Sequence, residues 1–352
     1  MTKFTKRRIQ ALCLIATVPL GIVLSQFIDT ESAGYAAHFV EIYLLPLFFV
    51  GVGLELRHEF SVGYFKARAN ILAPLTAAVF GVIVPALLFV SIAGPQGGAW
   101  SIPTATDITL GLAVLSFVAA GFAGRLRARF LALATIDDVI ALVILLIVFS
   151  GEISWAACLA TLAALGAFHF AQKLPAVFGF AVLLSGTLAI VFGVESGIQT
   201  SLIGVLLGLL ISKDALFSWL DSTNGWLVLP LFGFLISVTA GSSLAAGISA
   251  VVLVGVLLRP LGKLIGISIG GSLAARIFNG EWDGRTWASI GLLGGIGFTV
   301  SFLLAKLAYK DQEQLYGSAV LGTLGATIIS ALAFLVLANL RGRRERQVER
   351  SL

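Results

Sequence analysis

Long apolar segments, separated by short polar stretches, dominate the pattern of residues along the chain. A helix that spans a bilayer needs about 20 consecutive apolar residues, and about twelve such segments can be placed. They cover residues 9–28, 36–54, 70–93, 103–120, 127–150, 153–171, 175–194, 198–212, 224–240, 244–269, 285–307 and 315–340. The pattern predicts an all-α membrane protein with about twelve transmembrane helices.

Two of these segments are interrupted by residues that break helices. The fourth begins with the proline and polar run Pro103–Asp107, and the eleventh carries Gly291, Gly294, Gly295 and Gly297. The third to fifth and the tenth to twelfth segments are therefore expected to be inverted-topology repeats, each with a broken helix at its middle. An alternative for the glycines is close helix packing, because Gly291 and Gly295 form a GxxxG motif.

The basic residues indicate the orientation of the chain, because cytoplasmic loops collect Lys and Arg. Placing both termini in the cytoplasm puts the runs KFTKRR and RGRRER inside, and leaves Lys306 and Lys310 as the outer exceptions. Reading the first segment as a cleaved signal peptide is the alternative, but its removal would leave an odd number of segments. The expected organisation is a single polytopic membrane domain over residues 1–340, followed by a basic cytoplasmic tail over 341–352.

Composition supports a membrane protein and excludes other classes. The chain is 58% hydrophobic and 12% charged, whereas soluble domains carry roughly 25% charged residues. A net charge of +5 does not indicate nucleic-acid binding here, because the basic residues gather at the termini and in short loops. Cys13 and Cys158 fit neither a zinc site nor a disulfide framework. No cofactor and no enzymatic activity are expected.

Three aspartates lie inside the apolar segments, at Asp107, Asp137 and Asp138. An acid at that depth costs roughly 2.5–3.5 kcal/mol on insertion scales, so these residues are candidates for carrying ions or protons. Arg259 and Lys263 are the basic residues expected at similar depth. Broken helices expose partial charges of about half a unit at their ends, and Asp107 with Arg259 is expected to neutralise them where the two broken helices cross.

Asp137 and Asp138 form the candidate exchange site. Consecutive helical residues point about 100° apart, so only one of the two faces a given cavity squarely. Two ionised carboxylates this close repel each other, which favours binding of a proton near neutral pH. Carboxylate oxygens also suit a hard monovalent cation, with threonine hydroxyls and carbonyl groups freed by the helix breaks as further ligands. Sodium or lithium would then compete with protons, which is the minimum requirement for antiport.

Several runs of the sequence resemble the NhaA-type sodium/proton antiporter family. They are PLFFVGVGLELRHE (46–59), IVPALL (83–88), WSIPTATDITLGLAVL (100–115), FLALATIDDVIAL (130–142), SGIQTSLIGVLLG (196–208), LPLFGF (229–234), RPLG (259–262) and LLGGIGFTVSFLLAKLAY (292–309). The resemblance covers most of the chain in order, and the ATD and IDD motifs are specific together. It implies a fold of twelve helices in which the fourth and eleventh cross as broken helices, and electrogenic exchange of sodium or lithium for protons.

The resemblance also implies roles for individual residues. Asp138 matches the principal carboxylate that binds cation and proton, Asp137 matches its close partner, and Asp107 matches the residue at the first helix break. Thr106 is the adjacent polar residue of that break.

The resemblance implies a pH response for Glu55 and Glu59, which match acids of the family's cytoplasmic funnel. With Arg57 and His58 they form a charged cluster that is interpreted either as a pH sensor, because histidine titrates in the right range, or as an ordinary hydrated helix end.

The chain departs from the family pattern at two places. Arg259 stands where the family has a lysine, and a guanidinium effectively never loses its proton. One hypothesis is that the two carboxylates alone carry protons; an alternative is that Lys263, one turn further on, replaces the missing lysine. The first outer loop, between Ile28 and Ala36, is too short for the β-hairpin through which family members can dimerise, so a homodimer would lack that contact.

These observations lead to a prediction of a multi-pass antiporter of the bacterial inner membrane that works by alternating access. A core bundle is expected over about 70–150 and 244–340, and interface helices over about 9–54 and 153–240. The expected partners are sodium or lithium, protons and the lipid bilayer. The alternatives are a sodium-coupled symporter of an organic anion, a channel, and an intramembrane aspartyl protease, although neither ATD nor IDD fits the GxGD-type run of that protease.

Overall fold

The computed structural model describes residues 3–28, 35, 39–62, 68–118, 120–174, 178–212, 214–243, 247–277, 284–310 and 312–351. Within these ranges the chain forms α-helices, 3₁₀-helices and π-helical turns, and no strand. Five of the described helices are long and apolar enough to span a bilayer, and the bent pair α14 and α15 makes up to six spans. The predicted all-helical membrane class is therefore confirmed, whereas the number of twelve helices stays a prediction.

The chain folds into two compact units. Unit 1 comprises Met1–Leu12, Tyr64–Ala141 and Ser243–Leu352, and unit 2 comprises Cys13–Gly63 and Leu142–Ser242. Helices α1 (Lys3–Leu24) and α6 (Ala120–Val148) contribute residues to both units.

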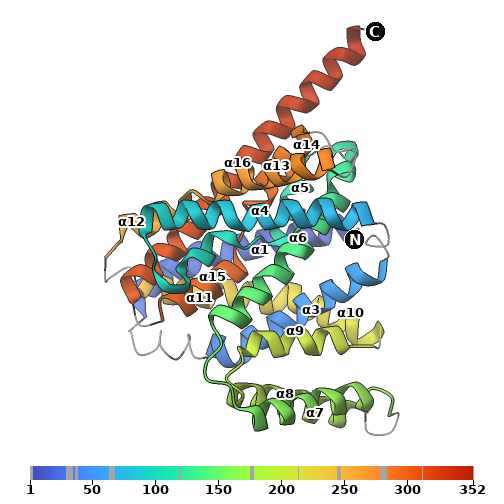
Figure 1. Cartoon of the computed structure of the whole chain (residues 1–352), viewed down its shortest axis with the longest axis vertical. Helices are drawn as coiled ribbons and strands as arrows, with labels where there is room; N and C mark the ends of the chain where they lie inside the picture. The colour runs from blue at the N-terminus through green and yellow to red at the C-terminus, as the bar shows by residue number, and fades with distance from the viewer. Residues whose placement is uncertain are drawn as a thin grey trace. The chain divides into compact units, whose positions relative to one another are not determined.

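Unit 1 contains the interrupted helices. Its further elements are α4 (Arg68–Ala93), the 3₁₀-helix η4 (Gly97–Thr104), α5 (Ile108–Leu115), α12 (Ala250–Leu257), α13 (Arg259–Ile277), α14 (Gly284–Gly294), α15 (Thr299–Ala308) and α16 (Glu313–Ser351). In Figure 1, α13 runs alongside α4, and α16 continues past α14 to the C-terminus.

A seam of glycines brings α13 and α4 into close contact. Gly262, Gly266 and Gly270 recur every four residues on α13 and face the main chain of α4. A Cβ atom on Gly262 would lie 2.7 Å from the Cα of Pro85, and one on Gly270 would lie 2.6 Å from the carbonyl oxygen of Thr76. Such small residues permit tight packing in a membrane, where apolar burial alone does not drive helices together. The seam fixes the first turns of α13, which carry the basic residues of the site.

Unit 2 is built from helix pairs. Its elements are the 3₁₀-turn η1 (Ser25–Phe27), the π-helical turn η2 (Val40–Leu44), α3 (Leu45–Val62), α7 (Trp155–Ala171), α8 (Phe178–Glu195), α9 (Thr200–Leu210), α10 (Asp214–Thr223), the π-helical turn η5 (Asn224–Val228) and α11 (Leu229–Ser243). Helices α7 and α8 pack as a hairpin, and α3 packs against α9 (Figure 1).

An internal repeat, which the hydropathy pattern did not reveal, lies within unit 2. The sequence Leu-Pro-Leu-Phe begins both α3, at Leu45, and α11, at Leu229, and a π-helical turn precedes each copy. The last residues of the two copies, Phe48 and Phe232, stack on each other with ring centroids 5.6 Å apart and an angle of 14° between their planes.

Several helix ends differ from those predicted by hydropathy. Helix α3 continues to Val62, and α13 continues to Ile277. The basic segment that follows residue 340 continues α16 as far as Ser351, because Arg, Gln and Glu are good helix formers and no proline interrupts them. The short first outer loop falls on residues 29–34 and 36, which lie outside the described residues.

Candidate functional site

Asp107 lies at the first helix break of unit 1. The 3₁₀-helix η4 ends at Thr104 and α5 begins at Ile108, so Ala105, Thr106 and Asp107 connect two helical pieces without being helical themselves. Asp107 is the N-cap of α5, and its Oδ1 accepts a hydrogen bond of 2.9 Å from the amide of Leu110. A carboxylate at a helix N-terminus satisfies a free amide and offsets the positive end of the helix dipole.

Of the predicted glycines, Gly294, Gly295 and Gly297 lie at the second break, whereas Gly291 lies within α14 and packs closely against Leu264. Helix α14 ends at Gly294 and α15 begins at Thr299, and the two helix axes differ in direction by 58°. Gly297 is closely surrounded, because a Cβ atom there would meet the carbonyl oxygen of Ala105 and would lie 2.8 Å from Nη1 of Arg259.

Three hydrogen bonds join the two breaks directly. The amide of Asp107 donates to the carbonyl of Ile296 at 2.8 Å, and Oγ1 of Thr106 donates to the carbonyl of Gly294 at 2.7 Å. Thr299, the first residue of α15, donates its hydroxyl to Oδ2 of Asp107 at 3.0 Å. The carboxylate of Asp107 therefore receives hydrogen bonds from the first turns of both α5 and α15.

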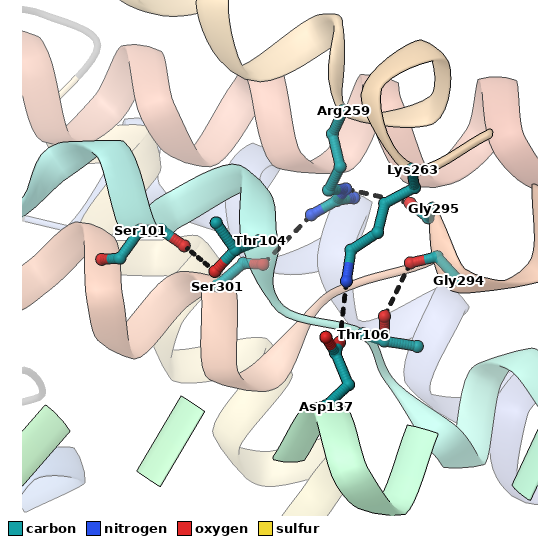
Figure 2. A network of polar contacts seen from close by, with 9 residues as sticks. All are labelled: Ser101, Thr104, Thr106, Asp137, Arg259, Lys263, Gly294, Gly295 and Ser301. Carbon is teal, nitrogen blue, oxygen red and sulfur yellow. Dashed lines mark hydrogen bonds and ion pairs between the residues drawn. The ribbon is translucent and has the colours of Figure 1, made fainter. Parts of the chain in front are cut away.

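Arg259 binds the carbonyl end of α14. Its side chain is fully buried, Nε donates to the carbonyl of Gly295 at 2.9 Å, and Nη2 donates to the carbonyl of Gly297 at 2.9 Å. Nη1 reaches the hydroxyl of Ser301 in α15 at 3.1 Å, as Figure 2 shows. A fixed positive charge at the C-terminal end of α14 offsets the negative end of that helix dipole.

Lys263 forms a buried ion pair with Asp137. Its Nζ lies 2.8 Å from Oδ2 of Asp137, and the two side chains are 0% and 1% exposed. Figure 2 shows this pair, which comes from α13 and α6, beside Thr106 and Gly294. The other carboxylate oxygen of Asp137, Oδ1, has no hydrogen-bond partner among the described residues.

Comparisons with known proteins identify the family of this chain. A model of the family described as Na+/H+ antiporter 1 matches residues 14–337. The chain belongs to this Na+/H+ antiporter family. Its relatives are transporters, so it is a multi-pass membrane protein of the bacterial plasma membrane and not an enzyme in the usual sense.

Named relatives support the assignment, and a solved structure shows the same fold. The Na(+)/H(+) antiporter NhaA 2 of Clavibacter michiganensis subsp. michiganensis is 33% identical over 367 residues, covering 95% of this chain and 88% of the relative. NhaA of Mycolicibacterium smegmatis is 33% identical over 317 residues, covering 84% of this chain and 74% of the relative. The structure of the sodium proton antiporter MjNhaP1 from Methanocaldococcus jannaschii at pH 8 matches with a TM-score of 0.58 at 15% identity, over 96% of this chain and 99% of that chain. This last likeness shows the fold alone.

In this antiporter family member, Asp138 follows Asp137 on α6 and is buried, with 9% of the residue exposed. Thr135 lies three residues before Asp138 on the same helix, and its buried hydroxyl has no hydrogen-bond partner among the described residues. No group of three or more His, Cys, Asp or Glu residues suited to a metal ion occurs in the described part of the chain.

The proposed pH-response cluster lies in unit 2, on the C-terminal half of α3. Glu55 and Arg57 are partly buried and His58 is exposed, while the side chain of Glu59 lies outside the described residues. The carboxylates of the exchange site belong to unit 1.

Several polar partners of the site were not among the predicted site residues. Thr299 and Ser301 in α15, and Thr327 and Ser330 in α16, contact Asp107, Arg259 or the carbonyl groups of the second break. Hydroxyl residues that recur on one face of an otherwise apolar helix were the available signal.

Proposed function

We propose that the protein exchanges sodium or lithium for protons across the bacterial inner membrane by alternating access at Asp138 and Asp137. The observation that carries this proposal is the pair of adjacent carboxylates, buried in an apolar span of α6 within unit 1. Membership of the Na+/H+ antiporter family supplies sodium and protons as the transported ions.

Coupling follows from competition for the same oxygen atoms. Asp138 is the principal carboxylate and Asp137 its partner, and each binds either a proton or the cation. Lys263 occupies Oδ2 of Asp137 in this structure, so an incoming cation and the lysine ammonium compete for that carboxylate. Because burying an unpaired charge is costly, an empty ionised site does not reorient, whereas a protonated or cation-bound site does.

Lys263 is a better candidate than Arg259 for the role of the lysine that the family pattern has at the position of Arg259. Arg259 donates to carbonyl and hydroxyl oxygens at the second break, while the ammonium of Lys263 contacts Asp137 directly. This contact favours the alternative in which Lys263 releases a proton during exchange, over the hypothesis that the carboxylates alone carry protons.

The remaining site residues hold the two interrupted helices in place. Asp107 and Thr106 join the breaks, Gly294, Gly295 and Gly297 permit their close approach, and Arg259 compensates the end of α14. In this proposal the interrupted helices cross at these residues, as the fourth and eleventh of twelve spans.

The proposal extends to the two units of the chain. Unit 1 acts as the core that carries the ions, and unit 2 supplies the interface helices, with both termini in the cytoplasm. The cluster Glu55, Arg57, His58 and Glu59 tunes the response to pH, and any homodimer forms without a hairpin in the first outer loop.

Reconstitution into liposomes tests the proposed function. Purified protein is reconstituted with an internal pH dye and receives pulses of sodium, lithium or potassium under a clamped membrane potential. We expect sodium or lithium to shift the internal pH with the wild-type chain, and we expect no response from Asp138→Asn. Glu152→Gln, which removes an exposed acid, is the matched control and should retain the response.

Two results would overturn the proposal. Failure of the wild-type protein to respond to any cation would exclude cation/proton antiport. A cation flux that persists in Asp138→Asn would indicate a channel instead.

A further inference from the structure

Helix α16 presents three hydroxyl residues toward the second break. Thr323, Thr327 and Ser330 are spaced four and three residues apart, which places them on one face of the helix. Thr323 and Ser330 are fully buried and Thr327 is partly buried. A polar side chain in an apolar span needs a partner, so the contacts of this face indicate what it does.

Thr327 connects Arg259 with the main chain of the break. Its Oγ1 accepts a hydrogen bond of 2.7 Å from Nη2 of Arg259. The single hydroxyl proton is within reach of the carbonyl of Gly297 at 2.5 Å and of the carbonyl of Thr323 at 2.9 Å. Nη2 of Arg259 also donates to the carbonyl of Gly297, so Arg259, Thr327 and Gly297 are each hydrogen-bonded to the other two.

Each carbonyl group of residues 292–297, at and before the second break, accepts a hydrogen bond. Ser330 donates to the carbonyl of Leu292, and the amide of Ile296 donates to that of Leu293. Thr106 donates to Gly294, which places a residue of the first break on the end of α14.

The next three carbonyl groups, those of Gly295, Ile296 and Gly297, also accept hydrogen bonds. Arg259 donates to Gly295, the amide of Asp107 donates to Ile296, and both Arg259 and Thr327 bind Gly297. A break without these donors would leave buried carbonyl groups unsatisfied, which is costly in an apolar span. The geometry of the break therefore depends on donors from other helices, and α16 provides two of them.

We propose that Thr327 is a positioning residue of the exchange site. It fixes the guanidinium of Arg259 against the carbonyl of Gly297, and thereby fixes the start of α15, where Thr299 binds Asp107 two residues further along. Thr327 acts through these groups without touching the carboxylates of α6, and no role was assigned to it above. The inference rests on the proposed function, because its readout is exchange.

The chain offers a matched control one turn away. The hydroxyl of Thr323 has no hydrogen-bond partner among the described residues, and Arg259 contacts only its main-chain carbonyl. Thr327→Val and Thr323→Val therefore make the same chemical change on the same face of α16. They differ in that only the first removes a hydrogen bond to Arg259.

The test measures the sodium dependence of exchange in proteoliposomes for Thr327→Val, Thr323→Val and Thr327→Ser. A hydrogen bond to a charged group contributes about 1.5–3 kcal/mol, so we expect the KM for sodium to rise about tenfold or more in Thr327→Val. The pH profile should shift as well. Thr323→Val should resemble the wild type, and Thr327→Ser should restore the wild-type KM because it retains the hydroxyl.

The thermal stability of each detergent-solubilised variant separates positioning from folding. If Thr327→Val does not yield folded protein, Thr327→Ala removes the same hydroxyl without adding a methyl group and is measured in the same way. A KM equal to that of Thr323→Val, or a loss of stability at unchanged KM, would overturn the assignment. A wild-type protein that exchanges no cation would instead overturn the proposed function.

Discussion

Two basic residues one helical turn apart have different partners in this protein. Arg259 donates to the oxygen atoms of a helix break, whereas Lys263 forms an ion pair with a carboxylate of α6. The planar guanidinium offers several fixed donors and stays charged, which suits a structural role among carbonyl groups. The ammonium is a single compact charge, which suits direct contact with one carboxylate oxygen.

Lys263→Gln should destabilise the protein because it leaves the carboxylate of Asp137 buried without its cation. Breaking a buried ion pair costs about 3–5 kcal/mol, and proton uptake by the carboxylate would reduce this cost. The double variant Lys263→Gln/Asp137→Asn should recover most of the loss, because neither charge remains. Thermal unfolding in one detergent measures both effects, with the exposed Lys310→Gln as control. Equal instability of the single and double variants would contradict the assigned ion pair.

Gly297→Ala should disrupt the second break, since the added methyl group would collide with the carbonyl of Ala105 and with Arg259. Overpacking of this kind costs about 1–3 kcal/mol. Gly124→Ala in α6 is the matched control, because a Cβ atom there meets no atom within 4 Å. We expect the first variant to lose stability and exchange, and the second to be neutral or slightly stabilised. Wild-type exchange and stability in Gly297→Ala would show that the break tolerates a wider spacing.

The hydropathy pattern predicted the apolar spans of unit 1 well. It predicted only part of how these spans are interrupted. The polar run before Asp107 and the glycines after Leu293 identified the residues at which helices end, because proline and glycine are strong local signals. The ion pair between Lys263 and Asp137 could not be predicted from these local signals, because it depends on how α13 is rotated about its own axis relative to α6. That rotation is set by contacts such as the glycine seam with α4.

The 3₁₀-helix η4 and the helix α15 run from the breaks toward the same side of unit 1. At their far ends, Tyr309 donates its hydroxyl to Oε1 of Gln96 at 2.7 Å. Burial raises the pKa of the Tyr309 hydroxyl above its usual range. The hydroxyl therefore remains protonated, and the contact persists through neutral and moderately alkaline pH.

A covalent cross-link between the far ends of η4 and α15 should stop exchange if these ends move apart during alternating access. We expect the pair Gln96→Cys/Tyr309→Cys, joined by a short bifunctional thiol reagent, to lose cation-dependent pH changes in liposomes. The native Cys13 and Cys158 are first replaced by alanine, so that the reagent finds no other thiol. Each single cysteine variant with the same reagent is the control. Undiminished exchange after complete linking would show that η4 and α15 move together.

At the scale of the whole molecule, we expect the charges of the proposed site to determine how exchange responds to voltage. Asp107, Asp137 and Asp138 carry three negative charges and Arg259 and Lys263 carry two positive ones, so the net charge of these five groups is −1 when all are ionised. One proton or one sodium ion on Asp138 neutralises this excess. In the proposed exchange, a second proton moves only if the cation also displaces the proton of Lys263.

Lys263→Gln should therefore reduce the charge moved for each sodium ion. With lysine present, we expect two protons per sodium and a reversal potential that depends on membrane voltage. The glutamine variant has one exchangeable proton fewer, so its exchange should become insensitive to voltage. The difference is measured as the reversal potential of exchange in liposomes whose membrane potential is set by a potassium gradient. Lys310→Gln is the control and should keep the wild-type value. A variant that keeps the wild-type reversal potential would show that the carboxylates alone carry the protons.

The repeated Leu-Pro-Leu-Phe sequence of unit 2 has a consequence for the stability of that unit. The two copies begin at Leu45 and Leu229, follow the same kind of helical turn, and meet at the stacked rings of Phe48 and Phe232. Because each ring packs on its equivalent in the other copy, replacing either phenylalanine with a small residue should loosen the packing of both α3 and α11.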